Sequence, residues 1–141
     1  MCVLLLLAPG AFAQAPAESV PPSATMKQLM VDLIHPASND ILLFVNRGSV
    51  TDERGWAVVR RSAVTLAESA NLLTARGRAR DQGDWLKDAK ALADVGAAAY
   101  KAAEAKDAKA LAALAEPLDA SCTACHKQYR PNVFPRDGGS K

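Results

Sequence analysis

Four stretches of this chain carry apolar residues at alternating steps of three and four, and no other feature constrains the fold as strongly. This spacing puts the apolar side chains on one face of an α-helix. The connections between the stretches are short, which favours antiparallel neighbours. We therefore predict an all-α fold, an antiparallel up-down-up-down four-helix bundle. Its helices are expected over about Thr25–Asn46, from a cap at Thr51 or Asp52 to Gly77, from Gly83 to about Lys106, and from a cap at Asp107 to Pro131.

Two prolines interrupt these patterns. Pro36 removes a backbone hydrogen bond and is expected to kink or briefly break the first helix at His35. Pro117 lies inside the last helix, which is therefore expected to form two pieces, with the second starting near Glu116 and the proline in its first turn.

The N-terminus reads as an export signal. An apolar run is followed by Ala11-Phe12-Ala13, a small-residue cleavage pattern, although no Lys or Arg precedes the run. The expected organisation is a signal peptide over 1–13, a flexible lead-in over 14–23, one helical domain over 24–131 and a tail over 132–141. An exported, periplasmic chain without a membrane span in its mature part is the expectation; a disordered apolar N-terminus is the alternative.

Near the C-terminus the last helix carries Cys122-Thr123-Ala124-Cys125-His126. On a helix the two thiols, three residues apart, project from one face. They can form thioether bonds to the two vinyl groups of one porphyrin, and the histidine that follows can bind iron. The pattern therefore predicts one covalently attached haem c, with Cys122 and Cys125 as anchors and His126 as an iron ligand.

Other uses of a Cys-x-x-Cys pair remain open. A thioredoxin-type redox couple expects a βαβ setting, and no strand pattern appears. A zinc site would need more ligands, and the other candidates are Cys2 and His35.

Composition agrees with a bundle around a cofactor. Half of the residues are hydrophobic but only 5% are aromatic, so a porphyrin would supply apolar bulk. The net charge of +2 gives no argument for nucleic-acid binding.

These features together resemble the class II c-type cytochromes, the cytochrome c′ family with its low-spin relatives. That family has C-x-x-C-H near the end of a four-helix bundle, often followed by x-x-Tyr-Arg, as in His126-Lys127-Gln128-Tyr129-Arg130 here. Its first helix often shows Arg-x-x-x-Met or Arg-x-x-x-Leu, whose last residue faces the distal side of the haem. Met30 matches that position, whereas Met26 replaces the arginine. Relatives often dimerise, so a homodimer is possible.

The sixth position of the iron is open between several side chains. In an antiparallel bundle the start of the first helix lies beside the end of the last, so Met30 is expected to be level with His126 and to bind iron or pack on the haem. Met26 is the second candidate. His35 lies five residues from Met30, about 140° round an ideal helix, and is expected to point away from the haem unless the interruption at Pro36 changes its direction. Tyr129 is expected to pack on the porphyrin or hydrogen-bond a propionate, the alternative being a half-buried tyrosine at the helix end. Arg130 is expected to offset propionate charge, the alternative being a solvated arginine. Trp56 and Trp85 either edge the pocket or belong to the core.

We expect a periplasmic electron carrier and not an enzyme, because no acid–base pair or nucleophile stands out. Its redox partner protein is unidentified. The alternative is a five-coordinate, cytochrome c′-like protein that binds nitric oxide or carbon monoxide beside Met30 and Leu33.

Overall fold

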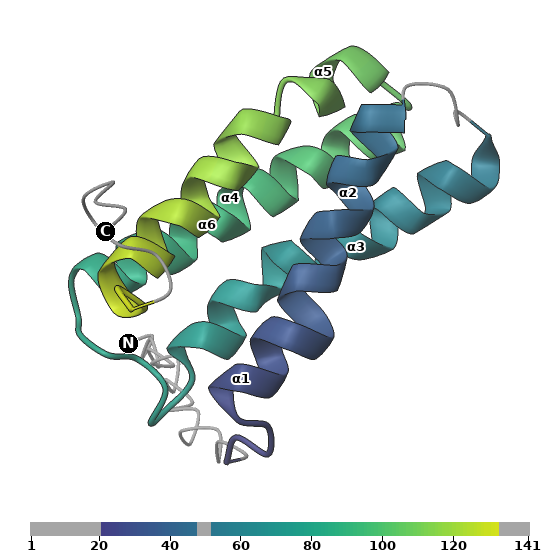
Figure 1. Cartoon of the computed structure of the whole chain (residues 1–141). Helices are drawn as coiled ribbons and strands as arrows, with labels where there is room; N and C mark the ends of the chain where they lie inside the picture. The colour runs from purple at the N-terminus through teal and green to yellow at the C-terminus, as the bar shows by residue number, and fades with distance from the viewer. Residues whose placement is uncertain (1–20, 48–51, 133–141) are drawn as a thin grey trace, which may run out of the picture.

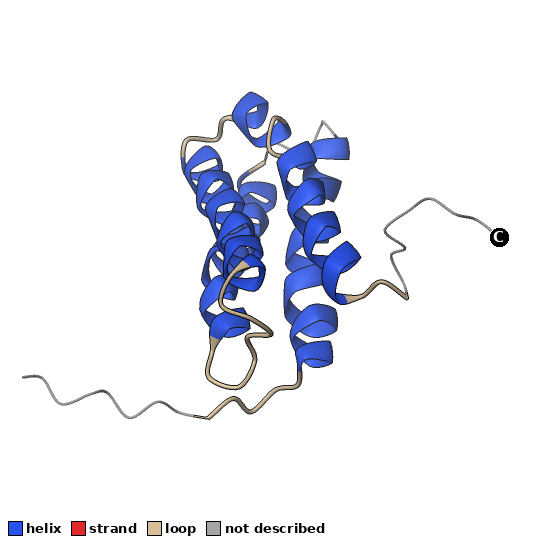
Figure 2. Ribbon diagram, turned by 90° about the vertical axis from the view of Figure 1, so that its left-hand side faces the viewer, coloured by secondary structure: helices blue, strands red, loops and turns tan. Residues whose placement is uncertain are grey.

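The computed structural model describes residues 21–47 and 52–132, and this part of the chain is all-helical (Figure 1). It contains four long helical stretches and one short helix, with no strand among the described residues (Figure 2). This arrangement agrees with the predicted four-helix bundle. The expected signal peptide, part of the lead-in and most of the expected tail lie outside the described residues.

The first stretch is one helical rod with an unusual turn inside it. It comprises α1 (Met26–Gln28), a π-helical segment η1 (Leu29–Ile34) and α2 (His35–Arg47). Thr25 caps the rod through a capping box with Gln28, whose backbone N–H donates to the Thr25 hydroxyl at 3.2 Å. The rod is not broken at His35, which keeps helical dihedral angles (φ −62°, ψ −45°).

Instead, the backbone hydrogen-bond pattern changes from α-helical to π-helical just before Pro36. The backbone N–H of His35 donates to the carbonyl of Met30, five residues earlier, rather than four. Pro36 has no N–H and cannot make the next α-helical bond, so a π-helical turn keeps the rod continuous at the place where a break was expected.

The second and third stretches pack closely against each other as a hairpin. They are α3 (Glu53–Thr74) and α4 (Asp84–Glu104). The Asp52 side chain caps α3 by accepting from Gly55 N–H at 2.7 Å. The helix ends at Thr74, three residues before the expected Gly77, which lies in the following turn with φ +83°. That positive φ explains why a glycine stands there.

The last stretch is divided as the sequence predicts. The short α5 (Ala108–Ala112) is capped by Asp107, and α6 (Ala115–Tyr129) carries Pro117 in its first turn. A proline there loses no intrahelical bond. Figure 1 shows α6 running back from α5 alongside α4, and α2 contacts both α5 and α6, so α2 and α6 are antiparallel.

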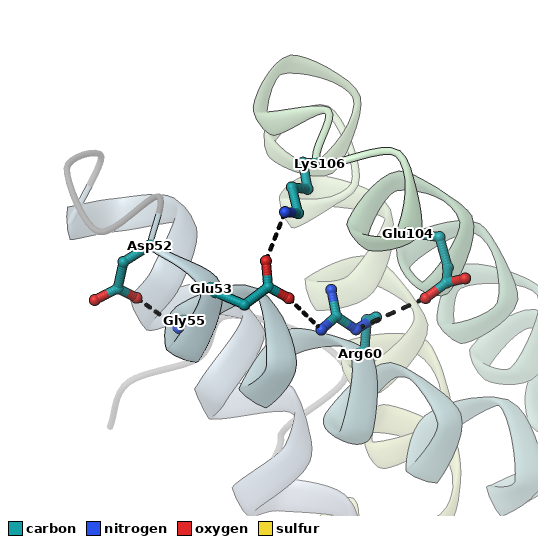
Figure 3. Close-up of polar contacts among 6 residues, drawn as sticks. All are labelled: Asp52, Glu53, Gly55, Arg60, Glu104 and Lys106. Atoms are coloured by element: carbon teal, nitrogen blue, oxygen red, sulfur yellow. Dashed lines mark hydrogen bonds and ion pairs between the residues drawn. The ribbon is translucent and has the colours of Figure 1, made fainter.

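Charged side chains join one end of the α3–α4 hairpin (Figure 3). Glu53 pairs with Lys106 at 2.5 Å and with Arg60 at 2.8 Å, and Arg60 also reaches Glu104 at 3.7 Å. Hydrogen bonds from Lys106 and Arg60 lower the pKa of Glu53 to about 2. Because Glu53 is exposed, the network orients the helix ends more than it stabilises them.

The core is built from the inward faces that the sequence pattern indicates. Ile41, Trp56, Leu66, Leu111 and Leu118 are almost fully buried, together with alanines of α3 and α4. Among the described residues, no helix has the length and apolar character needed to cross a membrane.

Candidate functional site

The Cys-x-x-Cys-His motif lies on the last two turns of α6, as its spacing predicts. Cys122, Cys125 and His126 are all half-buried, and both cysteines are free thiols. The Cys122 side chain lies close to Ser38 on α2. This contact joins the motif to the helix that runs antiparallel to it.

A cavity of about 620 Å³ adjoins this face of α6. Its size is within the range of small-molecule and cofactor sites. The two cysteines and His126 line one wall, and Trp85, Ala89 and Leu92 of α4 contribute another. The remaining apolar wall comes from the first rod, with Met30, Val31, Ile34 and Leu42.

Met30 is in the cavity wall, as expected, and it also packs against the core. Met26 packs against the core but is not among the described residues that line the cavity. Leu33, expected on the distal side, is 36% exposed and is likewise not among the described lining residues.

His35 is an exposed residue beside the cavity. His35 lines the cavity together with Met30, although an ideal α-helix would turn the two residues about 140° apart. The π-helical bond between the His35 N–H and the Met30 carbonyl explains the difference, because it puts residue i+5 roughly one turn above residue i. The sequence signal that could have indicated this turn is Pro36.

Arg130 lines the cavity, whereas Tyr129 is engaged elsewhere. The Tyr129 hydroxyl donates a hydrogen bond to Asp81, and its ring packs edge-on against Trp85 with centroids 4.8 Å apart. The hydrogen bond and the burial of Tyr129 raise the pKa of its hydroxyl, while accepting the bond lowers the pKa of Asp81. Tyr129 therefore anchors the end of α6 to the segment that precedes α4.

The two tryptophans have different roles. Trp85 lines the cavity and is held by a 2.9 Å hydrogen bond from its indole N–H to the Leu73 carbonyl. Trp56 belongs to the core and contacts Phe44, with ring centroids 4.7 Å apart.

The electrostatics of the thiols do not resemble those of a redox couple. Burial raises the pKa of Cys122, and it raises that of Cys125 to about 11, with a further contribution from Asp88. A reactive dithiol needs a lowered pKa, since the thiolate is the nucleophile. Both side chains are therefore thiols at neutral pH, with little tendency to attack a disulfide.

The surroundings of His126 disfavour its charged form. Burial lowers the pKa of its imidazole, and the nearby positive charge of Arg130 lowers it further. The neutral form is the one that binds metals. The environment thus favours the ligating form of His126.

Asp88 of α4 is a cavity residue that the sequence reasoning missed. One of its oxygens, Oδ2, is buried without a hydrogen-bond partner, and burial raises the pKa of the carboxyl group. The sequence signal was its position next to the inward-facing Ala89 of α4. Burial of a carboxylate at such a position costs free energy, so its presence there indicates a functional role.

These residues fit a planar, apolar cofactor that is bound at two thiols and one imidazole. The two thiols are unpaired, they adjoin a cavity of suitable size, and apolar side chains of the first rod and of α4 line the same cavity. A zinc site finds less support, because within residues 21–47 and 52–132 no three His, Cys, Asp or Glu side chains are grouped to hold a metal ion.

Comparison with known proteins adds nothing to this geometry. No family model, curated protein or solved structure matches the chain.

Proposed function

We propose that this protein is a c-type cytochrome that carries electrons through one haem c, bound covalently to Cys122 and Cys125. The observation that carries the proposal is that Cys122, Cys125 and His126 line one cavity together with apolar side chains of the first rod. When bound, the haem supplies an iron that cycles between ferric and ferrous states.

Each side chain of the motif has a defined task in this proposal. Cys122 and Cys125 hold the porphyrin against α6, and His126, in its neutral form, binds the iron from the same helix. The Ser38 contact positions Cys122, and the anchoring of Tyr129 to Asp81 holds the end of α6 in place.

The rest of the cavity controls access of water and the charge around the iron. Trp85, Ile34 and Leu92 exclude water from the porphyrin face, which keeps reorganisation small during electron transfer. Arg130 adds a positive charge at the rim, suited to the carboxylate groups of a haem. The thiols must meet haem outside the cytoplasm, which agrees with the periplasmic export predicted from residues 1–13. The partner is an unidentified redox protein.

The decisive test is the mass of the denatured protein. The chain is expressed with its N-terminal segment in a host that matures c-type cytochromes, and the mass is measured after denaturation. We expect the mature polypeptide plus one haem, and a reduced-minus-oxidised absorption spectrum of haem c. A double replacement of Cys122 and Cys125 by Ala should give the mass of the bare polypeptide. An unmodified mass for the unsubstituted protein would refute the proposal.

The spin state of the same sample separates electron transfer from gas binding. A six-coordinate, low-spin ferric spectrum supports the electron carrier. A high-spin, five-coordinate spectrum, with rapid binding of carbon monoxide by the ferrous form, supports the alternative function.

A further inference from the structure

We propose that His35 is the second axial ligand of the iron, opposite His126, in place of the methionine expected from the sequence. This inference rests on the proposed haem attachment and specifies its coordination. Three observations carry it: the π-helical turn, the register of α2 against α6, and the position of His35 on the cavity wall.

The π-helical turn brings a strong iron ligand onto the face that adjoins the cavity. In an uninterrupted α-helix, His35 would lie on a different side of the rod from Met30. The bond from the His35 N–H to the Met30 carbonyl aligns the two residues, and both line the cavity. Single π-helical turns inside α-helices are frequent at functional sites.

The register of the two antiparallel helices favours His35 over Met30. The contact between Ser38 and Cys122 gives a common level on α2 and α6. From this level, His126 lies four residues further along α6, or about 6 Å at the rise of an α-helix. On the rod, His35 lies three residues from Ser38 in the same direction, or about 4.5 Å at that rise, whereas Met30 lies eight residues away, on the far side of the π-helical bond.

The imidazole of His35 is therefore nearly level with His126 across the cavity, and the Met30 thioether lies beyond it. His35 is an exposed residue that lines the cavity. Neutral imidazole is a common ligand of iron, and a second imidazole in place of a thioether gives a lower reduction potential. Met30 then packs beside the porphyrin as part of the apolar wall.

The test compares three variants of the haem-loaded full chain by absorption and electron paramagnetic resonance spectroscopy of the ferric form. The wild type should be low-spin without a methionine–iron charge-transfer band. His35→Ala should become high-spin with unchanged haem content, and added imidazole should restore the low-spin spectrum. Met30→Leu should remain low-spin, and so should Asn39→Ala, a control at a cavity residue that does not bind iron.

Several results would overturn the proposal. These are a high-spin wild type, a low-spin His35→Ala variant that shows the methionine charge-transfer band, or a high-spin Met30→Leu variant. None of them affects covalent haem attachment. If instead the wild type carries no haem, the proposed function fails at an earlier step, and the mass measurement identifies that case.

Discussion

Replacing Gly96 with alanine tests how closely α3 and α4 approach each other. Gly96 is buried on the face of α4 that contacts α3. A Cβ atom at this position would lie 2.4 Å from the backbone nitrogen of Ala67, 2.8 Å from the carbonyl carbon of Leu66 and 2.9 Å from its Cβ. Two of these three atoms are backbone, so no change of rotamer can remove the overlap, and the helices must separate.

The expected cost follows from two opposing terms. Overpacking of a well-packed interior typically costs about 1–3 kcal/mol, and the upper part of this range applies because backbone atoms are involved. Alanine in place of glycine in a helix returns roughly 0.5–1 kcal/mol. We therefore expect Gly96→Ala to lower the free energy of unfolding by about 2 kcal/mol, equivalent to a fall in Tm of roughly 8 °C for a domain of this size.

The assay is urea and thermal unfolding followed by circular dichroism, with Ala97→Gly as the matched control. Ala97 is the next residue on α4 and is exposed, so its replacement measures the helix-propensity term alone. The control should cost about 0.5–1 kcal/mol. If Gly96→Ala proves as stable as the wild type or more stable, the close approach of α3 and α4 is wrong.

Two further substitutions test the surroundings of the cavity. Tyr129→Phe should raise the pKa of Asp81 towards its ordinary value, because the hydrogen bond from the Tyr129 hydroxyl is the largest cause of the lowered pKa. NMR titration of the Asp81 carboxyl carbon measures this pKa, and an unchanged value would contradict the contact between Tyr129 and Asp81. Asp88→Asn should stabilise the protein at neutral pH by less than about 1 kcal/mol, because it removes a partly buried charge whose Oδ2 has no hydrogen-bond partner but which solvent screens. Burial raises the folded-state pKa of Asp88, so wild-type stability falls as pH rises from the unfolded value through the folded one. Urea unfolding should therefore show the advantage of the variant disappearing at acid pH, and an equal advantage at all pH values would refute this explanation.

The parts of the fold that the sequence predicts well are those governed by local rules. The apolar stripes of α3, α4 and α6, the caps at Asp52 and Asp107, and the division of the last helix at Pro117 all depend on residues within one or two turns. The one-sided presentation of Cys122 and Cys125 has the same origin.

The errors occur where local rules compete. Pro36 was expected to interrupt the first helix, but packing of Ile34, Ala37 and Ile41 into the core favours a continuous rod. A π-helical turn satisfies both the proline and the core, and it rotates the residues before it. For this reason His35 lines the same cavity as Met30, which an ideal α-helix would not predict.

The sequence by itself determined that four amphipathic helices form and that the last of them presents two thiols and an imidazole in order. Both follow from periodicity along a single helix. Only the tertiary structure decided which side chains face that motif, because this depends on the register between α2 and α6 and on the widened turn before Pro36. Such features are set by packing between segments distant in the chain, and no local pattern specifies them.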